Sequence, residues 1–169
     1  MTHAPLSPVS NPGWRAWLIW SVGVAAYVLA STNRTSLGAV GVDAADRFQA
    51  DASTLALFAV VQLAVYGGMQ IPVGVLLDRF GSRPIITIGM LLMAAGQLVM
   101  AFSPSIGIAI LARVLLGAGD AAVFPAVLRL VAVWFPAQRG PVMVQFTGII
   151  GQAGQLVALV PLAALLHAT

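Results

Sequence analysis

The stretch "GVLLDRFGSRPIITIG", residues 74–89, places one aspartate and two arginines between two long apolar runs. Charges are rare in this chain, since 60% of its 169 residues are hydrophobic and only 8% are charged. A water-soluble domain covers its core with a charged and mixed surface, and so few charges cannot cover a globule of this size. Because lipid needs no such cover, the composition predicts a membrane protein.

The apolar runs on either side of this charged turn are long enough to cross a bilayer. A helix needs about 20 apolar residues to span a hydrocarbon core of about 30 Å. Five segments meet this requirement, and short polar turns connect them: residues 14–42, 54–77, 84–102, 105–134 and 141–166. The first could also be read as a secretory signal, but it continues past Ala30 and further spans follow it. The sequence therefore predicts an all-α bundle of transmembrane helices behind a disordered tail, residues 1–13.

Several classes of function lack the residues that they require. All eight basic residues are arginines scattered singly along the chain, whereas nucleic-acid binding needs clustered positive charge. The chain has no cysteine, and its histidines, His3 and His167, lie in the two chain ends. A metal site or a nucleophile–histidine pair has almost nothing to be built from. We expect neither enzyme activity, nor a cofactor, nor a nucleic-acid partner.

The arginines are distributed unequally between the two sides of the predicted bundle. Alternation of the spans puts most of them on one side, where they are Arg15, Arg79, Arg83 and Arg139, with Arg129 close by. The opposite side has Arg47 among Asp43, Asp46 and Asp51. Arginine in short loops favours the cytoplasmic side. We therefore expect a multi-pass protein of the plasma (inner) membrane with a cytoplasmic amino terminus.

Asp78 in the charged turn needs a further explanation, because it lies at the carboxyl end of its helix, where the macrodipole disfavours a negative charge. A positive partner elsewhere is expected. The turn resembles the Gly-x-x-x-Asp-Arg-x-Gly-x-Arg signature of major facilitator superfamily transporters, and the matching residues are Gly74, Asp78, Arg79, Gly81 and Arg83. The resemblance implies a conformational latch, in which the aspartate meets a helix of the second half of the transporter in the outward-facing state.

A second block supports the same resemblance. Arg113, Gly117 and Gly119 match the Arg-x-x-x-Gly-x-Gly arrangement of the fourth span of this superfamily. The resemblance covers about the first five of its twelve helices, so the chain is expected to be a fragment or a truncated product that lacks the second half. The segments "NRTSLG" and "GDAAVFPA" are most similar to the anion and metabolite symporters. The fifth span lacks the Gly-Pro-x-x-Gly-Gly series of the proton antiporters, which disfavours drug efflux.

Polar residues within the spans are candidates for a substrate site. Arg34 shares a helical face with Tyr27 and Ser31, so this face is expected to line a cavity, although Arg34 could instead snorkel to the outer interface. Its guanidinium suits bidentate contact with a carboxylate or phosphate of the substrate. In the second span, Gln62 and Tyr66 belong to a polar stripe that either lines a pore or bonds to the next helix.

The fourth span carries two charges, Arg113 and Asp120, seven residues apart on one face. They are too far apart for direct contact unless both bend or share another group. We expect them to form a buried charge network, in which Arg113 could also contact substrate and Asp120 could carry a coupling proton.

These features predict secondary active transport of a small anionic organic solute by symport and alternating access. The expected partners are the lipid bilayer, the solute and the remainder of the transporter. Two alternatives stay open: a proton-coupled efflux transporter of the same superfamily, and a truncated membrane scaffold that does not transport. The substrate, the coupling ion and the direction of transport are not specified by the sequence.

The predicted orientation is testable because the chain has no cysteine of its own. A single Ala50→Cys in the acidic loop should react with a membrane-impermeant maleimide added to intact cells, and Ser82→Cys should react only after the membrane is permeabilised. Labelling of Ser82→Cys in intact cells would contradict the orientation.

Overall fold

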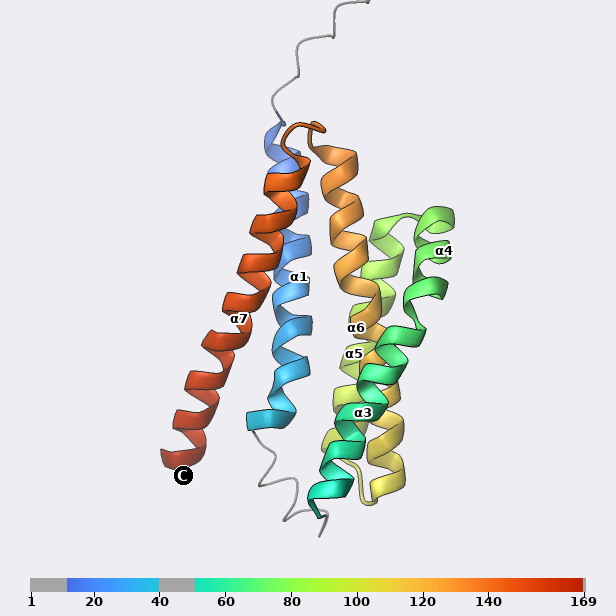
Figure 1. Cartoon of the computed structure of the whole chain (residues 1–169), viewed down its shortest axis with the longest axis vertical. Coiled ribbons are helices and arrows are strands. Elements are labelled where there is room, and N and C mark those ends of the chain that lie inside the picture. The colour runs from blue at the N-terminus through green and yellow to red at the C-terminus, as the bar shows by residue number, and fades with distance from the viewer. Residues whose placement is uncertain (1–11, 40–50, 169) are drawn as a thin grey trace, which may run out of the picture.

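A computed structural model describes residues 12–39 and 51–168 of the chain (Figure 1). The described residues form helices and no strand, in the order α1 (Trp14–Ala39), α3 (Ala52–Gly68), α4 (Gln70–Phe80), α5 (Ser82–Ala101), α6 (Ile106–Trp134) and α7 (Gly140–Ala168). The helices run alongside one another in an elongated bundle (Figure 1). The predicted all-α membrane fold is confirmed.

Membrane crossings can be assigned from the length and composition of these helices. Among the described residues, three helices are long and apolar enough to cross a bilayer: α1, α5 and α6. The pair α3 and α4 adds a fourth crossing if it forms one bent span. Helix α7 has 29 residues and is about 43 Å long, although the side chains beyond Leu156 lie outside the described part.

Local signals fix two of the helix boundaries. The Asp51 carboxylate caps α3 and accepts hydrogen bonds from the Thr54 hydroxyl, the Thr54 N–H and the Ser53 hydroxyl, which together hold the pKa of Asp51 below its ordinary value. Gly81 separates α4 from α5 with φ of 79° and ψ of 177°, a conformation that residues with a Cβ rarely adopt. The motif glycine therefore makes the tight turn that the sequence predicts.

The second predicted span, residues 54–77, is not one straight helix. It breaks at Met69, and the axes of α3 and α4 differ by 44°. Pro72 accounts for the break, because it has no N–H to bond the Gly68 carbonyl four residues earlier and its ring crowds that carbonyl. Hydrogen bonds from Met69 N–H to the Val65 carbonyl and from Val73 N–H to the Met69 carbonyl continue on both sides of it.

Helix α6 is the centre of the bundle and makes its most extensive contact with α5. At their crossing Gly89 meets Gly119, and a Cβ built on Gly119 would lie 2.5 Å from the Gly89 carbonyl oxygen. On another face of α6, a Cβ on Gly117 would lie 2.5 Å from the Gln62 carbonyl oxygen of α3. These glycines let backbones approach closely, which is how helices associate tightly in lipid.

Helix α1 lies between α6 and α7. Two glycines of α7 pack against α1: Gly151 contacts the ring of Tyr27, and Gly154 contacts Val28. Gly148 has open space around it. Near the amino end of α1, the Trp20 indole N–H donates to the Thr147 hydroxyl of α7 at 3.0 Å. The small glycines of α7 and the large Trp20 of α1 thus both contribute to the packing of α1 against α7.

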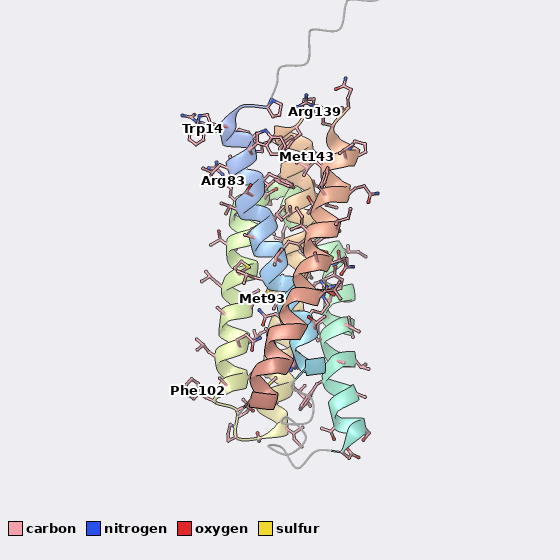
Figure 2. The ribbon with its side chains drawn as sticks, turned by 90° about the vertical axis from the view of Figure 1, so that its left-hand side faces the viewer. Trp14, Arg83, Met93, Phe102, Arg139 and Met143 are labelled. Carbon is pink, nitrogen blue, oxygen red and sulfur yellow. The ribbon has the colours of Figure 1, made fainter. Side chains whose placement is uncertain are left out.

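The two ends of the bundle differ in charge. Trp14, Arg83 and Arg139 all lie toward the same end of the bundle (Figure 2). The turn between α4 and α5 and the turn between α6 and α7 are at this same end (Figure 1). The arginines that the positive-inside rule assigns to one side therefore share one end of the structure.

The contact between α5 and α6 predicts a contrast between two Gly→Ala variants. Gly119→Ala puts a methyl group against backbone, so the helices must separate, and we expect a loss of about 1–3 kcal/mol in the free energy of unfolding. Gly148→Ala enters open space and should cause no loss. Chemical unfolding of both variants in one detergent measures the difference, and equal stabilities would show that the crossing is not tightly packed.

Candidate functional site

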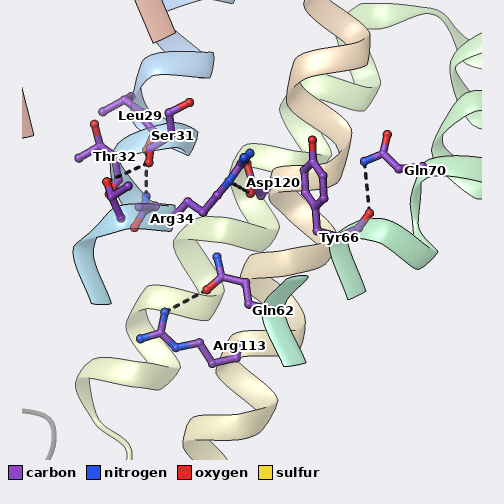
Figure 3. Close-up of polar contacts among 11 residues, drawn as sticks. Leu29, Ser31, Thr32, Arg34, Gln62, Tyr66, Gln70, Arg113 and Asp120 are labelled. Carbon is purple, nitrogen blue, oxygen red and sulfur yellow. Dashed lines mark hydrogen bonds and ion pairs between the residues drawn. The ribbon is translucent and has the colours of Figure 1, made fainter. Parts of the chain in front are cut away.

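The site centres on a bidentate ion pair between α1 and α6. Arg34 Nε donates to Asp120 Oδ2 at 2.8 Å, and Arg34 Nη2 donates to Oδ1 at 2.9 Å (Figure 3). Asp120 is 2% exposed, and the Arg34 side chain is 28% exposed. Asp120 lies at the midpoint of Ile106–Trp134, about 21 Å from either end of α6. The pair therefore lies at the middle of this span, with its arginine open on one side.

Tyr66 of α3 completes this arrangement. The Arg34 Cζ lies 4.7 Å from the centroid of the Tyr66 ring, within the range of a cation–π contact. Figure 3 shows the Tyr66 ring beside the ion pair, so three helices converge on the Arg34 guanidinium. The Arg34 guanidinium points toward α6, where it pairs with Asp120. It does not extend to the outer interface, as the snorkelling alternative requires.

The expected network between Arg113 and Asp120 is not what the structure contains. Asp120 pairs with Arg34, whereas Arg113 Nη1 donates to Gln62 Oε1 of α3 at 3.1 Å (Figure 3). The separation of seven residues along α6 explains this difference, because each group finds a closer partner on a neighbouring helix. Gln62 and Arg113 are each 5% exposed, so their hydrogen bond joins α3 to α6 in the interior of the bundle.

The other predicted cavity residues of α1 lie in the core. Tyr27 is 8% exposed, and its ring packs against Phe124 with 4.8 Å between centroids. No hydrogen bond or ion pair among the described residues joins Tyr27 to Arg34. Ser31 is fully buried, and its hydroxyl has no hydrogen-bond partner among the described residues. The face that these residues share with Arg34 is thus covered by α6 and α7 along most of its length.

Two polar contacts were not anticipated from the sequence. Gln97 of α5 donates to the Asn33 side-chain carbonyl of α1, next to Arg34. Gln70, the third member of the polar stripe, donates to the Tyr66 carbonyl at 3.2 Å and so spans the break at Met69. The sequence signal for these contacts was the presence of single amide side chains, Asn33, Gln70 and Gln97, within apolar spans. A buried amide needs hydrogen-bond partners, which nearby helices can supply.

The partner of Asp78 is another difference. A partner was expected in the missing second half, but Asp78 at the end of α4 forms an ion pair with Arg129 of α6. The signal for this pair was present in the sequence, because Arg129 approaches the same predicted side of the membrane as Asp78. The Asp78 side chain is 81% exposed, so the pair contributes only about 0–1 kcal/mol.

The remaining residues of the charged motif lie on the surface of this half-bundle. A Cβ at Gly74 would meet nothing within 4 Å, so its predicted close approach to another helix does not occur among the described residues. Arg83 is exposed, and the Arg79 guanidinium carbon lies 5.3 Å from the centroid of the Phe80 ring. These residues are available to groups outside the described part of the chain.

The chemistry that the site displays is ion pairing between side chains. Within the described residues, no group of three or more His, Cys, Asp or Glu side chains could hold a metal ion. The site contains one fork of N–H donors, which is partly exposed, and one carboxylate, which is buried near the middle of α6.

The ion pair predicts strong energetic coupling between its two members. Arg34→Gln or Asp120→Asn alone leaves one charge unpaired, and we expect each to lower the free energy of unfolding by roughly 1.5–3 kcal/mol. The double variant should lose less than the sum of the single losses. Unfolding in detergent measures all three, with Arg83→Gln as an exposed control, and additive losses would mean that the pair does not form in solution.

Known proteins resemble this chain in sequence. The profile of the Major Facilitator Superfamily matches residues 23–169. An uncharacterized transporter of Bacillus subtilis, YybO, is 32% identical over 133 residues, which are 78% of this chain and 31% of that protein. A probable galactarate/D-glucarate transporter of Escherichia coli, GarP, is 31% identical over 113 residues, or 63% and 26% of the two chains. The mouse monocarboxylate transporter 11 is 31% identical over 145 residues, or 82% and 31%.

The chain thus spans less than a third of the length of these relatives. All of them are named as transporters and none as an enzyme. Together with the all-α bundle, the match over residues 23–169 identifies the chain as a member of the Major Facilitator Superfamily of membrane transporters.

Proposed function

We propose that this chain forms the amino-terminal part of a secondary active transporter, which carries a small anionic organic solute across the plasma (inner) membrane by symport. The amino terminus faces the cytoplasm in this proposal. The remainder of the transporter supplies the opposite wall of the cavity, and the two parts alternate about a site near mid-membrane.

The bidentate pair of Arg34 and Asp120 is the observation that supports this proposal. A charged side chain deep in a span is energetically costly and is generally retained for function. Arg34 presents a planar fork that fits any carboxylate, and 28% of its side chain is exposed. A solute carboxylate can therefore compete with Asp120 for the same donors.

This competition gives a physical basis for symport. When the solute carboxylate takes the Arg34 fork, Asp120 loses its counter-charge while it remains 2% exposed. A carboxylate without a partner at that depth has a lower free energy when it binds a proton. The bound anion and the proton on Asp120 would then cross together, and release of both would restore the ion pair.

The relatives' names agree with an anionic solute. Galactarate, D-glucarate and monocarboxylates, named for two of the relatives, all carry carboxylates. The same class of group would satisfy the Arg34 fork. Tyr66 would hold the guanidinium plane in position while the carboxylate exchanges, since its ring lies over Arg34.

Other residues have supporting roles in this proposal. Of the predicted substrate residues, Arg34 and Tyr66 remain as contacts, whereas Gln62 and Arg113 bond to each other and Tyr27 packs in the core. Near the cytoplasmic end, the ion pair of Asp78 with Arg129 would exchange for a group of the second half when the latch closes.

Substitution of Arg34 tests the anion site in a full-length transporter that has this chain as its amino-terminal part. Arg34→Lys keeps the charge and loses the fork, so the half-saturation concentration should rise about tenfold or more, the equivalent of one charged hydrogen bond. Arg34→Ala should abolish saturable uptake. Uptake of radiolabelled aldarate or monocarboxylate measures both, and unchanged uptake by folded Arg34→Ala would refute the site.

Substitution of Asp120 tests the coupling in the same full-length protein. Asp120→Asn cannot bind and release the proton, so it should lose accumulation driven by a proton gradient but keep exchange of labelled for unlabelled solute. Gradient-driven uptake that survives in Asp120→Asn would exclude the proposed coupling. Export of solute against entry of protons would instead indicate efflux, and saturable uptake by the 169-residue chain alone would show that no second half is needed.

A further inference from the structure

Asn33 and Arg34 are neighbours on α1, and their side chains bind two different helices. Arg34 binds Asp120 of α6 through Nε at 2.8 Å and Nη2 at 2.9 Å. The Asn33 side-chain carbonyl accepts a hydrogen bond from Gln97 Nε2 of α5. Successive residues of a helix point about 100° apart. Two bonds in different directions, to two other helices, therefore define the rotation of α1 about its axis at this level.

The part of α5 that carries Gln97 packs directly against α6. One residue before Gln97, a Cβ on Gly96 would lie 2.9 Å from Leu116 Cγ and 3.1 Å from the Ala112 carbonyl oxygen. Leu116 is one helical turn before Asp120 on α6. Because α5 and α6 are in close contact at this level, Gln97 has a defined position relative to the Asp120 carboxylate.

The bond to Gln97 is important for α1 because the two helices contact each other little elsewhere. The contact of α1 with α5 is much smaller than its contacts with α6 and α7. Asn33 and Gln97 are both half-buried in apolar spans, where an amide is most stable when it keeps a hydrogen-bond partner. An apolar side chain at position 97 would therefore remove a restraint on this end of α1.

This restraint acts when the Arg34 fork changes partner. In the proposed transport cycle a solute carboxylate takes the fork, and the bond from α1 to Asp120 is lost. The bond between Asn33 and Gln97 involves neither of these groups and can persist. We propose that Gln97 is a positioning residue of the anion site, whose bond to Asn33 holds the Arg34 fork in one orientation while it exchanges Asp120 for the solute. The role of Gln97 thus rests on the proposed anion site at Arg34.

A positioning role predicts a change in affinity without a matching change in maximal rate. A fork that is already oriented loses less conformational freedom when it binds, so removal of the restraint should weaken binding. Gln97→Met keeps the length of the side chain and cannot donate the hydrogen bond. In the full-length transporter it should raise the half-saturation concentration about threefold to tenfold, as expected for one hydrogen bond between helices in lipid. The maximal rate per folded molecule should change little.

Thr87→Val is the matched control on α5, because the Thr87 hydroxyl donates to the Arg83 carbonyl of the same helix at 3.0 Å. It should leave the half-saturation concentration unchanged. An unchanged value in Gln97→Met, or a fall in maximal rate alone, would overturn the proposal. Gln97→Leu replaces Gln97→Met if the latter does not fold. If neither variant folds, Gln97 has a structural role and the proposal fails.

Exchange of the two amides tests the bond itself. Gln97→Asn shortens one side chain by a methylene group and should raise the half-saturation concentration. Asn33→Gln lengthens the other side chain by the same amount. The double variant should therefore return the half-saturation concentration toward the parent value. A double variant that is no better than Gln97→Asn alone would contradict the proposed role of this bond.

A measurement without solute separates the role of Gln97 from the proposed function. The energetic coupling of Arg34 with Asp120 is obtained by unfolding Arg34→Gln, Asp120→Asn and the double variant of the 169-residue chain. If Gln97 orients Arg34, this coupling should be smaller in a Gln97→Met background and unchanged in a Thr87→Val background. Equal coupling in both backgrounds would refute the positioning role. Reduced coupling, combined with no saturable uptake by the full-length parent, would confirm that Gln97 orients Arg34 and refute the proposed function instead.

Discussion

A charge inside a bilayer is most stable when it pairs with an opposite charge or reaches water, and this constraint acts strongly on Asp120. Its carboxylate lies at the midpoint of α6 and is 2% exposed. Water is out of reach there, so the stable arrangement brings a guanidinium to it across the bundle. The pairing sets the rotation of α1 about its axis and places Tyr66 of α3 over the guanidinium. The close helix contacts at Gly117 and Gly119 of α6 are compatible with this pairing of Arg34 and Asp120.

Helix α6 can satisfy several neighbours at once because successive residues of a helix point about 100° apart. Within four consecutive positions, Gly117 admits the backbone of α3, Gly119 admits α5, and Asp120 binds Arg34 of α1. Glycine is needed at the first two positions because carbonyl oxygens would lie 2.5 Å from a Cβ there. A short segment thus fixes three helices around one charge, and small residues on α7 hold α1 from the other side.

The sequence was sufficient for the fold class, because few charges and long apolar runs admit only helices in lipid. It also identified Arg34 and Asp120 as functional candidates, but it could not show that they pair. The spacing of residues along one helix can be read from the sequence, and it suggested a network of Arg113 with Asp120. Contacts between helices depend on how the helices pack, which the sequence does not show. Arg129 as the partner of Asp78 was missed for the same reason. The break of the second span at Met69 follows from Pro72, whose bend the sequence alone indicates.

The break at Met69 divides the second span into two rods that are anchored independently. The rod before it is held to α6 by Gly117 and by the bond of Gln62 with Arg113, and it carries Tyr66. The rod after it contacts α5 and α6 through Val73 and Leu77 and ends at the ion pair of Asp78. Because Gln70, which bonds to the Tyr66 carbonyl, lies at the break itself, a swing of α4 about this point would alter the charged end of the bundle more than the position of the ring over Arg34. In the proposed transporter, access at one membrane surface and contact with a solute at mid-depth would thus depend on different parts of a single span.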